Sequence, residues 1–330
     1  MAQETAALTV QDFNQRRPMA ATRKFYGETL LELARSDPRI VCLTADLTLP
    51  TETDLFRDAL PDRFLQVGIA EANMIGIAGG MARSGEIPFV HSFCVFATRR
   101  CYDQIAMQVA YPKANVKIVG VIPGLTTMLG VSHQATDDIA LMRALPNMTV
   151  IEPSGPAEVP AAVRAAAAHQ GPVYLRLKRA DGSEGNIAES PGVMPIGKLR
   201  RLREGSQGLL LTCGMMVEQA LAAADILARE GRSVGVVDVP TIKPLDPEIA
   251  SLARGAGVVV TAENHSVIGG LGSAVAELLM EAGVPARFAR VGVQDVFAEG
   301  GSTPYLFEKY GLNAEAIAAA FRSAQQTRSG

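Results

Sequence analysis

The segment RIVCLTA, residues 39–45, decides the fold class, because it is short, apolar and rich in β-branched side chains. Such a run is typical of a strand that is buried on both faces of a parallel sheet. Residues 23–35 precede it and show helical spacing, with four side chains on one face: Tyr26, Leu30, Leu33 and Ala34. A helix joined to a doubly buried strand indicates an α/β fold with crossover helices.

The same strand pattern recurs three times in the first half of the chain, at residues 115–122 (NVKIVGVI), 148–153 (MTVIEP) and 172–177 (PVYLRL). Helical patterns lie between these runs. The alternation stops at residues 180–206, where Gly, Ser, Pro and charged residues dominate. Such a composition is typical of a linker. The sequence therefore predicts that a first α/β domain ends here.

A second α/β pattern follows the linker. It contains four strand-like runs, GLLLTCG (208–214), SVGVVDV (233–239), AGVVVTAEN (256–264) and ARFARVGV (286–293). Helical spacing separates them, including a predicted helix over residues 271–282. We predict two domains, each a mainly parallel sheet flanked by helices. Their expected bounds are residues 1–182 and 203–330, joined by a linker over residues 183–202.

Composition excludes several classes of protein. The chain has 330 residues, 48% of them hydrophobic and 20% charged, and a net charge of -3 without a basic run. This argues against a nucleic-acid-binding surface, and no apolar stretch reaches membrane-spanning length. Residues 1–18 contain acids and lack the apolar core of a signal peptide. The four cysteines, without metal-ligand spacing, indicate buried thiols, so we expect a cytoplasmic protein with no metal site of its own.

One charged residue stands out in the run VGIAEANMIGIAGGMA, residues 67–82. Glu71 is its only carboxylate, and it is surrounded by apolar and small residues. A glycine before a smooth helical pattern places Glu71 in the first turn of a helix, where the helix dipole favours an acid. A carboxylate in such surroundings also suits a partner with a buried, protonatable nitrogen. The residues alone leave both interpretations open.

Three further segments contain candidate functional residues. In PFVHSFCVFATRRCYDQI, residues 88–105, a strand end runs into a helix with Phe93 and Phe96 three residues apart, followed by two arginines. His133 lies in a loop before a helix, where a surface role is the commonest one. GGLGS, residues 269–273, follows a strand and opens a helix. An anion site and a tight turn with close helix packing both fit it.

The order of these segments resembles the C-terminal half of transketolase, as found in split two-subunit bacterial transketolases. The segments are TADLT, VGIAEANM, FCVFATR, SHQATDDIALMRALPNMTVIEP, VDVPTIKPLD and ENHSVIGGLGSAVAE, and the resemblance runs from about Met19 to Phe321. It implies a pyrimidine-binding domain followed by a transketolase C-terminal domain. Deoxyxylulose-phosphate synthases and the β subunits of 2-oxo acid dehydrogenases share this layout.

The resemblance implies roles at the cofactor thiamine diphosphate. Glu71 would share a proton with the aminopyrimidine ring, which needs a carboxylate partner in a dry site. Phe93 and Phe96 would stack against that ring. Asp46 and Arg99 match positions close to the cofactor. The cofactor would supply the reactive carbon, and the protein its orientation and electrostatics.

The resemblance also implies residues for the substrate. His133 would contact a substrate hydroxyl or carbonyl and assist proton transfer, and Arg179 would bind the phosphate of the acceptor. Arg176 fits a salt bridge at a strand end instead. Many relatives carry acids in the loop before His133, where this chain has Met128 and Leu129. This departure predicts a donor with fewer hydroxyl groups than ordinary transketolase uses.

The expected activity requires a partner. Relatives bind Mg²⁺ and the diphosphate through a GDG…N motif, and this chain contains no GDG. We therefore expect the Mg²⁺ ligands on an N-terminal partner subunit, with two copies of each subunit around a two-fold axis. The enzyme would transfer a two-carbon ketol unit from a ketose donor to an aldose acceptor. Alternatives are a 2-oxo acid dehydrogenase β-type subunit, a deoxyxylulose-phosphate-synthase-like enzyme, and a non-catalytic scaffold subunit.

Overall fold

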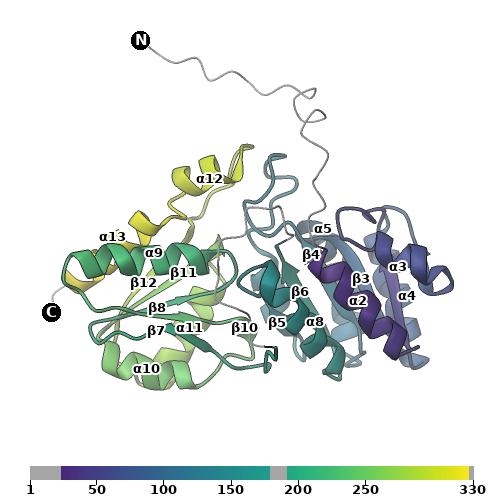
Figure 1. Ribbon diagram of the computed structural model, residues 1–330, viewed down its shortest axis with the longest axis horizontal. Helices are drawn as coiled ribbons and strands as arrows, with labels where there is room; N and C mark the ends of the chain where they lie inside the picture. Colours follow the sequence, from purple (N-terminus) through teal and green to yellow (C-terminus); the bar gives the residue numbers. More distant parts are fainter. Residues whose placement is uncertain (1–23, 179–191, 327–330) are drawn as a thin grey trace, which may run out of the picture.

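The computed structural model describes residues 24–178 and 192–326, which form two lobes side by side (Figure 1). Each lobe is built on one β-sheet with helices on both faces. This is the layered arrangement that alternating strands and helices produce. The fold class predicted from the sequence is therefore confirmed.

The first sheet has seven strands in the order β10-β5-β6-β4-β3-β1-β2. All neighbours pair in parallel except β10, which is antiparallel to β5. The bounds are β1 Ile40–Thr44, β2 Phe64–Gln66, β3 Ile87–Phe93, β4 Lys117–Val121, β5 Thr149–Ile151, β6 Val173–Leu177 and β10 Thr241–Lys243. β1, β4, β5 and β6 lie inside the segments predicted as strands and are buried along their whole length.

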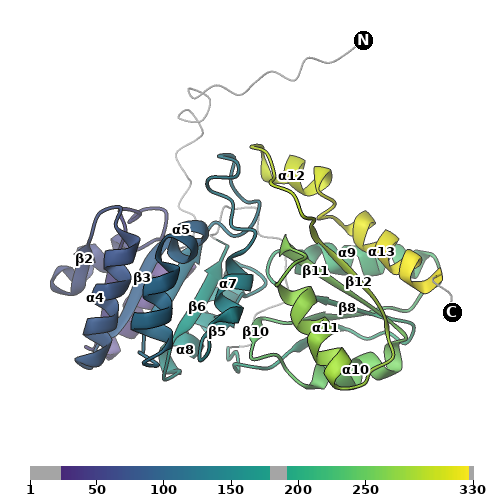
Figure 2. The same cartoon turned by 180° about the vertical axis from the view of Figure 1, so that it is seen from behind.

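Helices cover both faces of this sheet. α2 and α8 pack on one face (Figure 1), and α4, α5 and α7 pack on the other (Figure 2). Their bounds are α2 Phe25–Ser36, α4 Glu71–Arg83, α5 Cys94–Thr98, α7 Asp138–Ala144 and α8 Val159–Ala168. Shorter helical elements are α3 Asp54–Ala59, α6 Tyr102–Gln104, the 3-10 turns Pro61–Arg63, Arg99–Cys101 and Pro156–Glu158, and a π-helix over Ile105–Ala110.

The second sheet has five strands in the order β12-β11-β8-β9-β7. They are parallel except for the edge strand β7, and their bounds are β7 Arg200–Arg203, β8 Leu209–Thr212, β9 Gly235–Asp238, β11 Val258–Ser266 and β12 Arg287–Val293. α9 and α13 cover one face, and α10 and α11 the other. The helix bounds are α9 Met216–Arg229, α10 Glu248–Ala256, α11 Leu271–Glu281, α12 Thr303–Lys309 and α13 Ala314–Gln326.

The two lobes share structure across their boundary. β10 follows the linker in the chain, yet it completes the first sheet by pairing with β5. One apolar cluster joins α7 to α10 and α11 through Ile139, Ile249 and Leu271. β7 begins at Arg200, inside the segment predicted as a linker. The domain bounds at residues 182 and 203 stay predictions.

The described residues bear on two further expectations. Within residues 24–178 and 192–326, none of the helices is long and apolar enough to cross a membrane. All four cysteines are free and buried, as their apolar surroundings predicted: Cys42, Cys94, Cys101 and Cys213.

Candidate active site

The candidate site lies at the carboxyl end of β3, where α4 begins. Strand order places β2 and β3 on opposite sides of β1, and ligand sites of open α/β sheets form beside such a reversal. Glu71 is the first residue of α4, as predicted, and it is 3% exposed. Its carboxylate accepts hydrogen bonds from Ser92 Oγ (3.1 Å) and Arg100 Nη1 (3.2 Å). Both partners are side chains, so a ligand can replace them without disturbing the main chain.

The predicted aromatic residues gather next to this carboxylate. The ring centroids of Phe93 and Phe96 are 6.0 Å apart. His133 comes to them from the loop after β4, with its ring 5.1 Å from Phe96 and 6.3 Å from Phe93. Four of the predicted site residues, Glu71 included, therefore belong to one surface.

Arg100 connects the carboxylate to the aromatic rings. Its guanidinium carbon lies 3.6 Å from the centroid of Phe96, and the same group donates to Glu71. A planar cation thus stacks on an aromatic face while it bonds to a buried carboxylate. A protonated aminopyrimidine needs the same two partners, so the residues present fit that part of thiamine diphosphate. The Arg100 side chain is 45% exposed, which leaves this surface open to solvent.

Arg99, the arginine predicted to contact the cofactor, pairs with a different carboxylate. Arg99 forms an ion pair with Asp137 (Nη2 to Oδ1, 2.8 Å), whereas its neighbour Arg100 reaches Glu71. Successive residues of a 3-10 turn point about 120° apart, so the two arginines face different ways and only Arg100 reaches Glu71. The sequence marked both arginines but carried no signal for choosing between them. The role of Arg99 at the cofactor stays a prediction.

Two other residues were predicted to belong to the site, Asp46 and Arg179. Asp46 follows β1 with a left-handed φ of 60°, and its N–H donates to Gln66 Oε1 (2.8 Å). It is exposed at the same edge of the sheet, and its cofactor role stays a prediction. Arg179, predicted to bind the acceptor phosphate, lies outside the described residues.

A buried ionic network lies behind the site, and the sequence predicted its arginine as a salt-bridge partner but not the two carboxylates. Arg176 is fully buried on β6 and donates to Asp138 Oδ2 (2.8 Å) and Glu152 Oε1 (2.6 Å). Burial would raise the pKa of Asp138, but the charge of Arg176, the interaction with His265 and the hydrogen bonds from Arg176 and Tyr174 together outweigh it and lower that pKa. The salt-bridge interpretation of Arg176 is thus confirmed. The signal for it was a charged residue inside the doubly buried strand VYLRL.

The GGLGS segment does bind an anion, and the anion belongs to the chain itself. Glu263 accepts hydrogen bonds from the N–H groups of Leu271 (2.7 Å) and Gly272 (2.8 Å) at the start of α11. Its carboxylate is fully buried, and burial raises its pKa to about 7. The amides that could hold an external anion are therefore already used.

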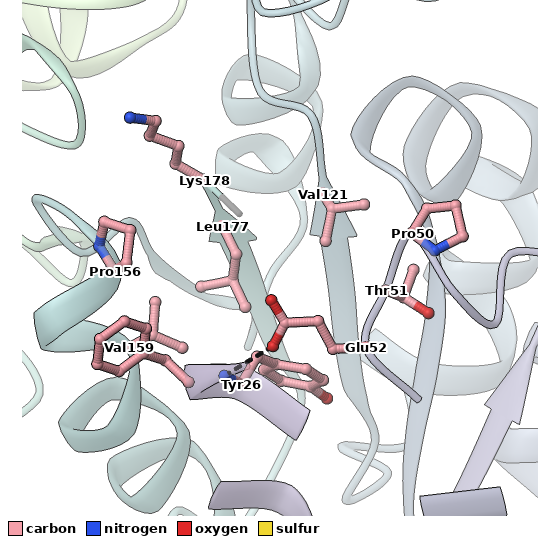
Figure 3. A pocket seen from close by; sticks show the side chains of 10 residues that line it. Tyr26, Pro50, Thr51, Glu52, Val121, Pro156, Val159, Leu177 and Lys178 are labelled. Carbon is pink, nitrogen blue, oxygen red and sulfur yellow. Dashed lines mark hydrogen bonds between the residues drawn. The ribbon is translucent and has the colours of Figure 1, made fainter. Parts of the chain in front are cut away.

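A small pocket with a mainly apolar lining lies near the amino end of α2, and Figure 3 shows the residues that line it. Glu52 points towards Tyr26 and accepts hydrogen bonds from the N–H groups of Tyr26 and Gly27, both at 3.1 Å. The Tyr26 hydroxyl donates to His91 Nε2 (2.6 Å), since His91 Nδ1 donates to the Leu43 carbonyl. Burial lowers the pKa of His91 to about 4, so this histidine is neutral and structural.

A metal site was not expected on this chain. Among the residues that the structure describes, no group of three or more His, Cys, Asp or Glu side chains is arranged to hold a metal ion.

Comparison with known proteins agrees with this arrangement. Residues 18–183 match the family described as transketolase, pyrimidine binding domain, and residues 197–317 match transketolase, C-terminal domain. A putative uncharacterized transketolase family protein of Sinorhizobium fredii is 47% identical over 298 residues, which cover 89% of this chain and 86% of that protein. The 6-deoxy-6-sulfo-D-fructose transketolase subunit of Clostridium sp. strain MSTE9 is 48% identical over 297 residues, covering 89% and 91%.

A solved structure of similar sequence shares the whole fold. It is described as a split gene transketolase, inactive β4 tetramer, and it is 46% identical to this chain. The superposition has a TM-score of 0.83 and covers 91% of this chain and 96% of the other.

Proposed function

The chain belongs to the transketolase family, and we propose that it is the C-terminal subunit of a two-subunit, thiamine-diphosphate-dependent transketolase. The observation that carries the proposal is the buried Glu71 carboxylate beside Phe96 and His133. When bound, thiamine diphosphate supplies a nucleophilic carbon that holds the transferred two-carbon unit. The residues of this chain bind and orient that cofactor.

Each residue of the site has a separate task in this proposal. Glu71 holds a proton at a ring nitrogen of the aminopyrimidine, because an ionised carboxylate is the strongest acceptor for it. Phe93 and Phe96 would give the ring an apolar face, and Arg100, which now stacks on Phe96, would leave that face free for it. His133 donates to, or accepts from, an oxygen of the sugar. Arg179 binds an acceptor phosphate, as the family resemblance implies.

The proposal includes a partner subunit that carries the GDG…N motif and the Mg²⁺ ligands. Two relatives support a divided enzyme: one is named a transketolase subunit, and the solved structure is called an inactive β4 tetramer. We expect the purified chain alone to bind thiamine diphosphate weakly and the complex to bind it tightly. Calorimetry that showed tight, Mg²⁺-dependent binding by the lone chain would reject the divided enzyme.

The donor is proposed to be a ketose, phosphorylated or otherwise charged at its far end. Met128, Leu129 and Val131 give the loop before His133 an exposed apolar surface, with exposed fractions of 36%, 60% and 44%. Each hydroxyl left without a partner there costs roughly 0.5–1.5 kcal/mol of binding. The sulfonated ketose in the name of the Clostridium relative is a donor of this kind to test first.

The deciding experiment is a donor screen on the complex of this chain with its co-expressed partner. Xylulose 5-phosphate, 6-deoxy-6-sulfofructose and pyruvate are compared, with an aldose phosphate as the acceptor. Ketol transfer from either ketose supports the proposal. Activity with pyruvate alone would instead favour a 2-oxo acid decarboxylase or a deoxyxylulose-phosphate-synthase-like enzyme. A best rate with xylulose 5-phosphate by a wide margin would reject the specificity that we assign to Met128 and Leu129.

A further inference from the structure

The loop that carries His133 is bonded at its base to a side chain from the second lobe. Asn264, on β11 and 1% exposed, accepts a hydrogen bond from the Leu125 N–H at Oδ1 (3.0 Å). Its Nδ2 donates to the Pro123 carbonyl (3.2 Å). The amide therefore pairs with main-chain groups on both sides of Gly124, as a neighbouring strand would.

Gly124 is the residue that makes this contact geometrically possible. Its φ is 54°, and a Cβ at this position would lie 2.2 Å from Oδ1 of Asn264. Gly124 also pairs with Ala135 across the base of the loop, with hydrogen bonds of 3.1 and 3.3 Å. Ala135 lies two residues after His133. The side chain of Asn264 therefore holds the first arm of the loop, residues 123–125, and this arm pairs with the second arm at Ala135.

Arg176 ties the second arm to the same residue. Its Nη2 donates both to the Ala135 carbonyl (3.0 Å) and to the Asn264 carbonyl (2.9 Å). A further contact between the lobes is Gln134 Nε2 to the Glu299 carbonyl (2.9 Å). The loop and the segment before α12 rise side by side in both views (Figures 1 and 2). Both arms of the loop are therefore hydrogen-bonded to residues of the second lobe.

We propose that Asn264 is a positioning residue, which holds the stem of this loop so that His133 keeps its place against Phe96. The inference rests on the proposed function, in which His133 contacts the substrate. It assigns a task to the second lobe, since a residue of β11 controls a side chain of the first lobe's site.

Hydrogen exchange on the full chain tests the contact without any cofactor. Asn264→Leu is close in shape but leaves the Leu125 N–H and the Pro123 carbonyl unpaired. Amides of residues 124–135 should then exchange at least about fivefold faster, which corresponds to the loss of one buried hydrogen bond. Thr212→Val is the matched control, because the buried Thr212 Oγ1 donates to the Ala262 carbonyl (3.0 Å) on the same sheet. Unchanged exchange in Asn264→Leu, or equal acceleration in Thr212→Val, would overturn the proposal.

Kinetics on the complex with its partner test whether Asn264 acts through His133. Asn264→Leu should lower kcat for a ketose donor by about tenfold or more, within the range for a misplaced acid–base group. In the background of His133→Ala the same change should cost almost nothing, because coupled residues are not additive. Full additivity of the two losses would overturn the positioning role.

A substitute variant and a second measurement keep the result interpretable. If Asn264→Leu does not fold, Asn264→Asp replaces it, since the introduced carboxyl keeps the acceptor for the Leu125 N–H. Proton exchange at C2 of bound thiamine diphosphate, which depends on Glu71, should be unchanged in the Asn264 variants. A complex that is inactive with every donor rejects the proposed function, while the hydrogen-exchange result still decides whether Asn264 holds the loop.

Discussion

Two buried glutamates at helix starts are held in opposite ways. Glu263 lies 0% exposed at the start of α11, and two main-chain amides fix both of its oxygens. Glu71 begins α4 and is bonded to the side chains of Ser92 and Arg100, one of which is largely exposed. Main-chain amides cannot move away, whereas an exposed arginine can. The two carboxylates are both buried, and they differ in whether their partners can be displaced, which is why the proposal assigns the ligand to Glu71 and not to Glu263.

The largest effect should come from Glu71→Gln. If Glu71 shares a proton with the cofactor, C2 proton exchange in the complex should slow by ~10²–10⁴-fold, because the amide is not an acid–base partner. The free energy of unfolding should change by no more than about 1 kcal/mol, the value of a helix-end charge. Glu263→Gln is the control, and its folded complex should keep the wild-type exchange rate. Slowing of less than about tenfold with the cofactor bound would leave Glu71 a helix-end residue.

The next effect concerns the pH dependence of stability. Burial raises the pKa of Glu263 from 4.5 to about 7, so between these values the folded protein binds more protons than the unfolded one. The protonated, buried carboxyl of Glu263 therefore stabilises the folded protein fully below pH 4.5, and this stabilisation is lost as pH rises through 7. At about 1.4 kcal/mol per pH unit, the loss amounts to about 3 kcal/mol.

Denaturant unfolding of the wild type and of Glu263→Gln measures this contribution. The difference in unfolding free energy between the two should shift against the wild type by about 3 kcal/mol from pH 4.5 to 8. The same measurement of unfolding free energy against pH is made for Glu71→Gln, as a second variant for comparison. A pH-independent difference for Glu263→Gln would show that the amides of α11 fully compensate for its burial.

The smallest effect should come from Arg100→Met. This removes an ion pair with a largely exposed arginine, which is worth about 0.2–1 kcal/mol, from the surface that the cofactor ring would occupy. Thiamine diphosphate should then bind the complex between roughly 1.5- and 5-fold more tightly. Arg164→Met, which breaks the exposed pair with Glu32, should leave the affinity unchanged. Weaker cofactor binding in Arg100→Met would mean that Arg100 is a ligand and not a competitor.

Local sequence patterns predicted most strands of the first sheet and the helix that begins at Glu71. The doubly buried strands β1, β4, β5 and β6 and the start of α4 at Glu71 all follow from a few consecutive residues. The family resemblance brought Phe93, Phe96 and His133 to Glu71, and the structure places these side chains on one surface.

The features that escaped prediction depend on distant partners. The pairing of Glu263 with α11 requires a bend that folds the chain back onto the end of its own strand. The choice of Arg100 over Arg99 depends on the rotation of a short helical turn. The contact of Asn264 with Leu125 joins residues 139 positions apart. Periodicity within a window of residues carries no signal for contacts of these kinds.

The pairing of β10 with β5 has a consequence for folding during synthesis. Synthesis reaches the linker while the first sheet still has an open edge, since the strand that covers β5 follows in the second half of the chain. An open strand edge is a template for pairing with other chains. A truncation after residue 178 would make that exposure permanent. A strand that comes after the linker thus covers an edge of the first sheet that would otherwise be free to pair with other chains.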